Sequence, residues 1–178
     1  MLDSSDARYL TARKIKNMKL GVMSDSHDNI PNVERAVARF NEIGVDLVVH
    51  AGDFIAPFAI DPLGDLNCRV VGVFGNNDGE RIVVAKRFEA IDGEVYPTLA
   101  SVSVGEKNIA VMHYPEFAIP IAKSGDFDIV VYGHTHEIDI QRGKSLLLNP
   151  GETGGWTTGK ATVAVVDLET LEATIHEL

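Results

Sequence analysis

Five short apolar runs constrain the fold of this chain more than any other feature of its sequence. Each run is nearly continuous rather than alternating with polar residues, which is typical of strands covered on both faces of a sheet. Such strands occur mainly in α/β proteins, in which helices or a second sheet supply the cover. The runs span residues 20–23, 47–49, 70–74, 109–112 and 129–132.

Helical patterns lie between these runs. Four apolar residues recur at the i, i+3, i+4, i+7 spacing of an amphipathic helix, with Pro31 near the start of the pattern and Gly44 just past its end. These four residues are Val33, Ala36, Val37 and Phe40. Further helices are predicted at residues 57–66, 80–90 and 115–124, the first and last of which contain proline.

The pattern changes after residue 135. Ile138 and Ile140 alternate with polar neighbours, and residues 145–148 form a second short apolar run. Two more apolar runs, 161–166 and 171–175, flank a polar turn and predict a hairpin. This order, with βα units first and an antiparallel meander last, predicts one α/β domain of two packed sheets with helices outside.

The length and the N-terminal sequence predict the domain organisation. With 178 residues the chain is long enough for one ordinary domain and too short for two. The first 17 residues are polar and then basic, unlike the apolar strand that begins at Met18. We therefore expect residues 1–17 to be a flexible N-terminal extension and residues 18–178 to be the single domain. In an alternative interpretation, Tyr9 and Leu10 dock a short helix on the domain or on a partner.

Charge and cysteine content exclude several classes of function. The net charge of −10 argues against stable binding of long nucleic acids, because an acidic surface repels phosphate backbones. The single cysteine, Cys68, excludes a disulfide framework or a cysteine-cluster metal site within one chain. No apolar run approaches the roughly 20 residues of a membrane span, and the acidic start is unlike a signal peptide. These features predict a cytoplasmic protein with no membrane partner.

Each of the five apolar runs ends in a polar cluster. In α/β sheets, ligands bind beyond the carboxyl ends of the strands. If the five strands share one sheet edge, their polar clusters converge on one site. In chain order the clusters are Ser24-Asp25-Ser26-His27, His50-Ala51-Gly52-Asp53, Gly75-Asn76-Asn77-Asp78, His113 and Gly133-His134-Thr135-His136.

The residue types in these clusters predict a metal site. They offer carboxylate, amide and imidazole donors without a thiolate, a set that suits Mn, Fe, Ni, Co or Zn better than Ca. The donors are too many for one tetrahedral ion, whereas two ions sharing a bridging carboxylate would use them all. Two metals about 3.5–4 Å apart are a common device for displacement at phosphorus. The glycines before Asp53, Asn76 and His134 are expected to let the backbone turn sharply and approach the metals.

These ordered clusters resemble the motifs of the metallophosphoesterase (calcineurin-like phosphoesterase) superfamily. The segment Leu148-Asn149-Pro150-Gly151 and the short length are most similar to its small, single-domain phosphodiesterase branch. The resemblance implies a β-sandwich of two mixed sheets flanked by α-helices and a binuclear metal site. It also implies hydrolysis of a small phosphodiester by attack of a metal-bound hydroxide, and it makes a homo-oligomer plausible.

The resemblance assigns the metal ligands position by position. The first ion would be held by Asp25, His27, Asp53 and His136. The second ion would be held by Asn76, His113 and His134, with Asp53 as the bridge between the two. The expected cofactors are two divalent ions, Mn²⁺ or Ni²⁺ first, with Zn²⁺, Fe²⁺ and Co²⁺ as alternatives.

One position departs from the family pattern. Many members carry a histidine after the Gly-Asn motif, where it protonates the leaving group or steadies the phosphate, but this chain has Asn77. An amide can donate a hydrogen bond to a phosphoryl oxygen but cannot release a proton usefully near neutral pH. The predicted catalytic residues are therefore Asp53 and Asn77, and activity should be best on diesters with acidic leaving groups. Asp78 is either an outer support of the site or a local cap.

Structural roles explain other polar residues more simply. His50 is expected to be a hydrogen-bonded core residue and His176 to face solvent. Asp25 and Asp53 could each cap a helix, but capping does not explain their occurrence together with four histidines in this order. The alternative to a metal-ligand role for Asn76 is that of an ordinary turn residue. The segment 151–159, with Trp156, is either a flexible turn or a wall of the site.

Two other functions compete with the phosphodiesterase. The same fold serves as a scaffold subunit in eukaryotic endosomal coat complexes, with a degraded metal site, and the absence of a histidine at Asn77 favours that alternative. The complete set of metal donors argues against it. A phosphomonoesterase is the third candidate, and the missing general acid makes it less attractive.

Overall fold

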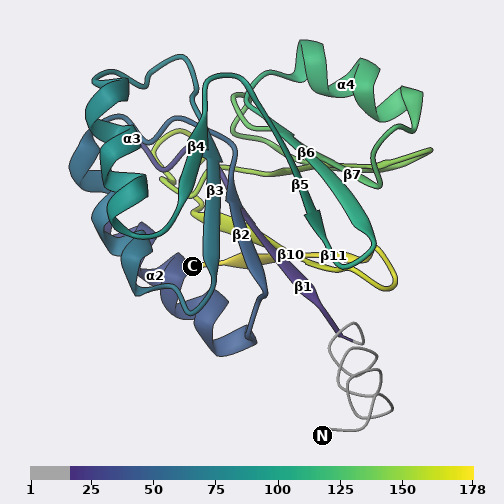
Figure 1. Cartoon of the computed structure of the whole chain (residues 1–178), viewed down its shortest axis with the longest axis horizontal. Coiled ribbons are helices and arrows are strands. Elements are labelled where there is room, and N and C mark those ends of the chain that lie inside the picture. The colour runs from purple at the N-terminus through teal and green to yellow at the C-terminus, as the bar shows by residue number, and fades with distance from the viewer. Residues whose placement is uncertain (1–16) are drawn as a thin grey trace, which may run out of the picture.

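The computed structural model describes residues 17–178. The predicted extension therefore lies outside the described residues, except for Asn17. The described chain forms two mixed β-sheets packed face to face, with helices on the outer faces (Figure 1). This arrangement confirms the predicted α/β fold of two mixed sheets flanked by helices.

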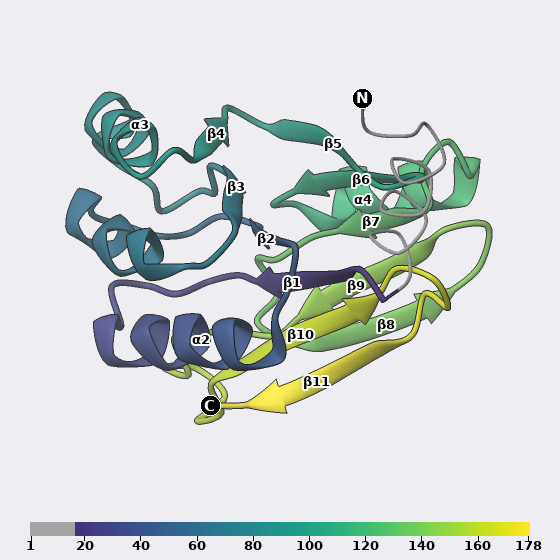
Figure 2. The ribbon, with the colours of Figure 1, turned by 60° about the horizontal axis from the view of Figure 1, so that its bottom comes forward.

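The first sheet has six strands in the order β11-β10-β1-β2-β3-β4. The strands β1, β2, β3 and β4 pair in parallel. The C-terminal hairpin adds β10, which runs antiparallel to β1, and β11, which runs antiparallel to β10 at the edge of the sheet, as Figure 2 shows. The parallel strands are β1 (Lys19–Met23), β2 (Leu47–His50), β3 (Arg69–Val73) and β4 (Glu94–Tyr96). The hairpin consists of β10 (Thr162–Asp167) and β11 (Ala173–Glu177).

The second sheet has five strands in the order β5-β6-β7-β9-β8. Its three central strands are parallel, and an antiparallel strand lies at each edge. The central strands are β6 (Lys107–Met112), β7 (Ile129–Val131) and β9 (Leu146–Pro150), and the edge strands are β5 (Leu99–Val104) and β8 (Ile138–Arg142). Sequence analysis missed β4 and β5, which are partly exposed edge strands without a continuous apolar run.

Helices cover the outer face of each sheet. The helix α2 (Ile30–Ile43) packs Val33, Ala36 and Phe40 against residues of β2, β3 and β10. The helix α3 (Arg81–Ala90) covers the same face, and α4 (Pro115–Ser124) covers the second sheet. A third apolar cluster fills the space between the sheets. The nearly continuous apolar runs therefore arise because the central strands have one face on this inner core and the other under a helix.

The structure corrects one predicted helix and supports the predicted ends of another. The segment predicted as a helix over 57–66 is the 3₁₀ helix η1 (Pro57–Asp65), which contains Pro62, a residue without the N–H that an α-helix interior needs. The helix α2 begins close to the predicted Pro31 and ends at the predicted Gly44, and Asn29 is an N-cap that the sequence prediction did not name. The Asn29 side chain accepts a hydrogen bond from the Asn32 N–H at its start, and Gly44 closes its end in the left-handed conformation at φ +72°.

The topology corrects two expectations. The five apolar strands do not share one sheet, because β1, β2 and β3 lie in the first sheet and β6 and β7 in the second. The last four strands do not form one meander either, because β8 and β9 belong to the second sheet and β10 and β11 to the first. The polar clusters still meet, since the carboxyl ends of the parallel strands of both sheets lie at the same end of the sandwich. A 2.7 Å contact between His113 Nδ1, after β6, and the Ala51 carbonyl oxygen, after β2, joins the two edges.

No helix within residues 17–178 is both long enough and apolar enough to cross a membrane.

Candidate metal centre

Strained backbone is concentrated in the polar clusters. Five of the seven predicted ligands have positive φ angles although none is glycine. Such conformations cost energy, on the order of 1–3 kcal/mol each, and persist only where the surrounding structure holds them. The five are Asp25 (+51°), His27 (+44°), Asp53 (+61°), His134 (+71°) and His136 (+61°). The chain therefore turns sharply at the predicted ligand residues themselves.

The glycines that precede the ligands have two different roles. Gly52, before Asp53, has a positive φ of +97° and makes the sharp turn that the sequence predicts. Gly75 and Gly133 do not have positive φ, so their backbone conformation does not itself require glycine. They are needed for the close approach of neighbouring side chains. A Cβ at Gly75 would overlap the Asp53 carboxylate, and one at Gly133 would overlap the Ser24 hydroxyl and the Asp25 carboxylate.

The first group of donors is formed by Asp25, His27 and His136. The Nε2 atoms of both histidines face the same oxygen of Asp25, at 3.8 Å for His27 and 3.4 Å for His136. His27 Nε2 also lies 3.6 Å from Asp53 Oδ2. Within the described residues it is buried and has no hydrogen-bond partner. A buried nitrogen that faces two carboxylates without bonding either fits a metal ligand.

The second group of donors surrounds Asn76. His113 Nε2 lies 2.9 Å and His134 Nδ1 lies 2.8 Å from the Asn76 amide oxygen. The Nδ1–H of His113 must donate to the Ala51 carbonyl, since a carbonyl only accepts. In the neutral ring, His113 Nε2 therefore presents a lone pair to an amide oxygen, which is the arrangement of two ligands of one cation.

Asp53 lies between the two groups. Its Oδ2 atom is 3.6 Å from His27 Nε2 and 3.6 Å from His113 Nε2. The carboxylate is 1% exposed. Asn77 holds it from the other side, because its backbone N–H donates to Oδ1 at 2.8 Å and its side-chain amide donates to Oδ2 at 2.7 Å. This is the position that a bridging carboxylate would occupy.

Negative charge on buried carboxylates dominates the electrostatics of the site. Burial raises the pKa of Asp25, but the imidazoles of His136 and His27 beside it and the hydrogen bond from the Ser24 hydroxyl outweigh burial and hold the pKa well below its ordinary value. Asp25 is therefore anionic near neutral pH. The neighbouring carboxylate of Asp25 raises the pKa of His27 and that of His136, with burial acting in the opposite direction. Both imidazoles thus lie where positive charge is stabilised, as at a cation site.

Asp78 supports two of the site loops at once. Its buried carboxylate accepts hydrogen bonds from the backbone N–H groups of Asp53 (3.0 Å), Ile55 (2.8 Å) and Gly75 (2.7 Å). The two roles that the sequence left open for Asp78, outer support of the site and local cap, are therefore both present. The residue caps local backbone N–H groups, and by doing so it ties the loop after β2 to the loop after β3.

The two remaining histidines lie outside both groups of donors. His50 is buried; its Nε2 is 3.1 Å from Ser26 Oγ, and its Nδ1 accepts from the Gly52 N–H at 3.2 Å. Burial lowers the pKa of His50 to about 3, so it stays neutral. Its predicted role as a hydrogen-bonded core residue is confirmed. His176, predicted to face solvent, is half-buried, and burial lowers its pKa.

Sequence analysis missed Glu152. Its side chain is fully buried, and its Oε2 atom lies 3.1 Å from His136 Nδ1. An acidic residue after Pro150 and Gly151 looks like an ordinary loop residue in the sequence, and only the structure shows that its buried side chain contacts His136. The same loop is packed rather than loose. The Thr153 N–H donates to the Ser24 carbonyl at 2.8 Å, so this part of the segment 151–159 packs beside Asp25, as expected for a wall of the site.

Similarity to known proteins extends over most of the chain. The family model described as "Calcineurin-like phosphoesterase superfamily domain" matches residues 18–171. Phosphodiesterase MJ0936 of Methanocaldococcus jannaschii is 37% identical over 159 residues, which cover 87% of this chain and 96% of that protein. Phosphodiesterase YfcE of Escherichia coli is 27% identical over 151 residues, 75% of this chain and 78% of the relative. The solved structure of an archaeal phosphodiesterase matches with a TM-score of 0.85 and 35% identity, covering 90% of this chain and 100% of that one.

Proposed function

This chain belongs to the calcineurin-like phosphoesterase superfamily, and we propose that it acts as a phosphodiesterase that uses two divalent metal ions at the centre described above. The phosphodiesterase activity follows from the 37% identity to an archaeal phosphodiesterase over nearly the whole length of both chains. Divalent metals are the cofactors of this family, and the chain carries a buried cluster of histidines and aspartates. The number of ions, their ligands and the roles of single residues are the proposal.

One observation carries the proposal. His27 Nε2 is buried without a hydrogen-bond partner in the described chain, between carboxylate oxygens of Asp25 and Asp53. Burying a polar atom unpaired is costly, so such atoms are rare in folded proteins. A cation bound among these three side chains would remove that cost and would neutralise the two carboxylates.

The contacts support one assignment of ligands. The first ion would be held by Asp25, His27, Asp53 and His136, and the second by Asp53, Asn76, His113 and His134. When bound, two such ions lower the pKa of water and neutralise charge on the oxygens of a phosphoryl group during displacement. Mn²⁺ and Ni²⁺ are the first metals to test, followed by Zn²⁺, Fe²⁺ and Co²⁺.

The chain's own residues orient the substrate and position the ligands. Asn77 is exposed beside Asp53, and its side-chain amide can donate a hydrogen bond to a phosphoryl oxygen. Asp78 holds the backbone of Asp53 and Gly75, so that the bridging carboxylate keeps its place. Because Asn77 cannot supply a proton, the leaving group must depart as an anion or take its proton from water. Diesters with acidic leaving groups are therefore the preferred class.

The scaffold alternative finds less support in these contacts. A protein that works only through its outer surface has no need to hold five donor residues in costly left-handed backbone conformations. Strain of this kind persists where a site requires it, and here it coincides with the metal donors. The observations therefore favour an enzyme over a scaffold.

The test is hydrolysis by protein that has been stripped with a chelator and reloaded with Mn²⁺, Ni²⁺ or Zn²⁺. We expect turnover of bis(p-nitrophenyl) phosphate only in the reloaded protein, with much slower turnover of p-nitrophenyl phosphate. Equilibrium dialysis should find two ions per chain. Protein that binds two ions but turns over neither ester with any metal would contradict the proposal and favour the scaffold.

Replacing Asn77 with histidine should restore general acid catalysis. The imidazole would stand beside the site in place of the amide. It should raise kcat/KM at least about tenfold for diesters with poor leaving groups, and much less for p-nitrophenyl esters. The measurement is a plot of log kcat/KM against the pKa of the leaving group, which should become shallower in Asn77→His.

The matched control is Asn67→His. Asn67 is an exposed asparagine that lies just before β3, whereas Asn77 lies just after it. It should leave the plot unchanged. If Asn77→His changed kcat/KM equally for good and poor leaving groups, the asparagine at position 77 would not be what limits proton transfer to the leaving group.

A further inference from the structure

The carboxylate of Glu152 is buried and surrounded by hydrogen-bond donors. Its two oxygens accept from the backbone N–H groups of Trp156, Thr157 and Thr158 and from the Thr158 hydroxyl. The side chain is 0% exposed, and no lysine or arginine contacts it within the described chain. A buried carboxylate needs such donors, because an unpaired buried charge is strongly destabilising.

One further contact of Glu152 leads into the metal centre. Its Oε2 atom lies 3.1 Å from Nδ1 of His136, whose Nε2 atom faces Asp25 Oδ1 at 3.4 Å. The hydrogen bond of Nδ1 is with the Thr157 hydroxyl, at 3.0 Å, and the Glu152 carboxylate lies beside the same nitrogen. A lone pair on Nδ1 would face the carboxylate oxygen, whereas an N–H there is attracted to it, so Glu152 favours the tautomer with the hydrogen on Nδ1. Glu152 thereby leaves the lone pair of the neutral imidazole on Nε2, the atom that faces the metal position.

The loop that Glu152 holds also contacts the other histidine of the first group. The indole Nε1–H of Trp156 donates to the backbone carbonyl of His27 at 3.1 Å. The Gly154 N–H donates to the carbonyl of Asp25 at 3.0 Å. One buried carboxylate therefore touches His136 directly and reaches the backbone of His27 and Asp25 through the loop.

We propose that Glu152 is a positioning residue of the first metal site. It fixes His136 with Nδ1 protonated and Nε2 aimed at the ion, and it holds the loop with Trp156 against His27. This inference rests on the proposed function, because it needs a metal ion at Asp25, His27 and His136. Carboxylates that orient a metal-bound histidine in this way contribute substantially to metal affinity.

A simpler role for Glu152 would be to hold the loop without acting on the metal site. The two roles predict different results. A glutamine at position 152 keeps the size of the side chain, but it has one acceptor oxygen in place of two. If that oxygen faces the loop, the glutamine NH₂ faces His136 and favours the tautomer with the lone pair on Nδ1. The hydrogen is then on Nε2, the atom that faces the metal position. Metal affinity then falls even where the loop stays folded.

The experiment is a titration of chelator-stripped Glu152→Gln and wild-type protein with Zn²⁺ and Mn²⁺. Calorimetry gives the Kd of each ion, and Trp156, the only tryptophan in the chain, gives a fluorescence signal beside the first site. We expect the Kd of one of the two ions to rise by about 10–100-fold and that of the other to change little. A Kd within about twofold of the wild type for both ions, in folded protein, would overturn the inference.

Two variants separate metal positioning from loop stability. Thr158→Val removes one hydroxyl donor from Glu152 Oε1 and leaves the contact of Oε2 with His136, so it should loosen the loop and raise the Kd of either ion much less than Glu152→Gln does. Glu94→Gln makes the same substitution at a carboxylate that accepts from Tyr96 and Arg69, at the end of the sheet away from the site. It should not change either Kd. An equal loss of affinity in Thr158→Val and Glu152→Gln would assign Glu152 to the loop alone.

A measurement on the wild-type protein decides the matter if Glu152→Gln does not fold. Long-range ¹H–¹⁵N spectra of the Zn²⁺-loaded protein report which nitrogen of each histidine carries the hydrogen. We expect His136 to be protonated on Nδ1 and metal-bound through Nε2, and the opposite tautomer would overturn the inference. Wild-type protein that binds no metal would instead contradict the proposed function itself, and this inference with it.

Discussion

Replacing Asp53 with alanine is expected to lower kcat/KM for a phosphodiester by at least about 10³-fold. Its carboxylate is the group that lies within 3.6 Å of both His27 Nε2 and His113 Nε2, so its loss removes a ligand from both proposed metal positions. Losing the two-metal arrangement costs several kcal/mol of transition-state stabilisation, and about 4 kcal/mol corresponds to 10³-fold in rate. The measurement is steady-state hydrolysis of bis(p-nitrophenyl) phosphate together with the number of bound metal ions per chain.

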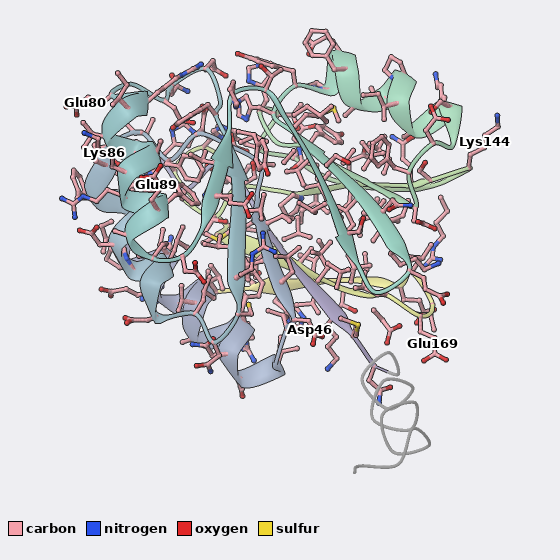
Figure 3. The ribbon with its side chains drawn as sticks, viewed as in Figure 1. Asp46, Glu80, Lys86, Glu89, Lys144 and Glu169 are labelled. Atoms are coloured by element: carbon pink, nitrogen blue, oxygen red, sulfur yellow. The ribbon has the colours of Figure 1, made fainter. Side chains whose placement is uncertain are left out.

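Asp46→Ala is the control for this experiment. Asp46 also accepts a backbone hydrogen bond, from the Lys19 N–H at 2.8 Å. Figure 3 shows it at the end of the sheet where β2 begins, away from the carboxyl ends of the strands. Asp46→Ala should keep full activity and both ions, with at most about 1 kcal/mol of lost stability. Asp53→Ala that retained two ions and at least a tenth of the wild-type activity would refute the bridging role.

Replacing Gly133 with alanine is expected to disable the site without touching any donor side chain. The added Cβ would overlap the Ser24 hydroxyl and the Asp25 carboxylate, which are buried and have no room to move. Overpacking of this kind costs about 1–3 kcal/mol of stability. Relief of the overlap must shift Asp25 or the adjacent His134, and a displacement of about 1 Å in a catalytic group can cost about 10²-fold in rate.

The measurements for Gly133→Ala are thermal unfolding, metal stoichiometry and diester hydrolysis. Gly79→Ala is the matched control, because a Cβ at Gly79 meets no atom within 4 Å and its φ is not in the left-handed region. Gly79→Ala should behave as the wild type in all three assays. Wild-type activity in Gly133→Ala would mean that the loop after β7 adapts freely. The close approach of Gly133 to Ser24 and Asp25 would then not be needed for activity.

Much of the fold could be predicted from the sequence. The central strands β1, β2, β3, β6 and β7 are buried on both faces, so their apolar runs are nearly continuous and easily recognised. The helix α2 has a clear apolar face, with Pro31 near its start and Gly44 at its end as recognisable signals. The strands β4 and β5 were not recognised, because edge strands are partly exposed and lack this signal. The 3₁₀ form of η1 also escaped prediction, since apolar spacing alone does not distinguish it from an α-helix.

Candidate site residues could be found because chemistry and position coincide in the sequence. His27, His113, His134 and His136 each follow an apolar strand, and parallel strands place such residues at one end of a sheet. Which donors belong together was not readable from that order. His136 lies opposite Asp25 and His27, more than a hundred residues away in the chain, because β7 and β1 end at the same end of two different sheets.

Local pattern and residue chemistry by themselves determined the class of fold, the end of the sheets that carries the site and the set of polar side chains gathered there. These properties depend on periodicity and on residue type, which are written along the chain. Only the tertiary structure decided how the strands divide between two sheets, why Gly75 and Gly133 must lack a side chain, and that Glu152 lies buried against His136. Those properties depend on close packing between segments that are distant in sequence, and no local pattern records such contacts.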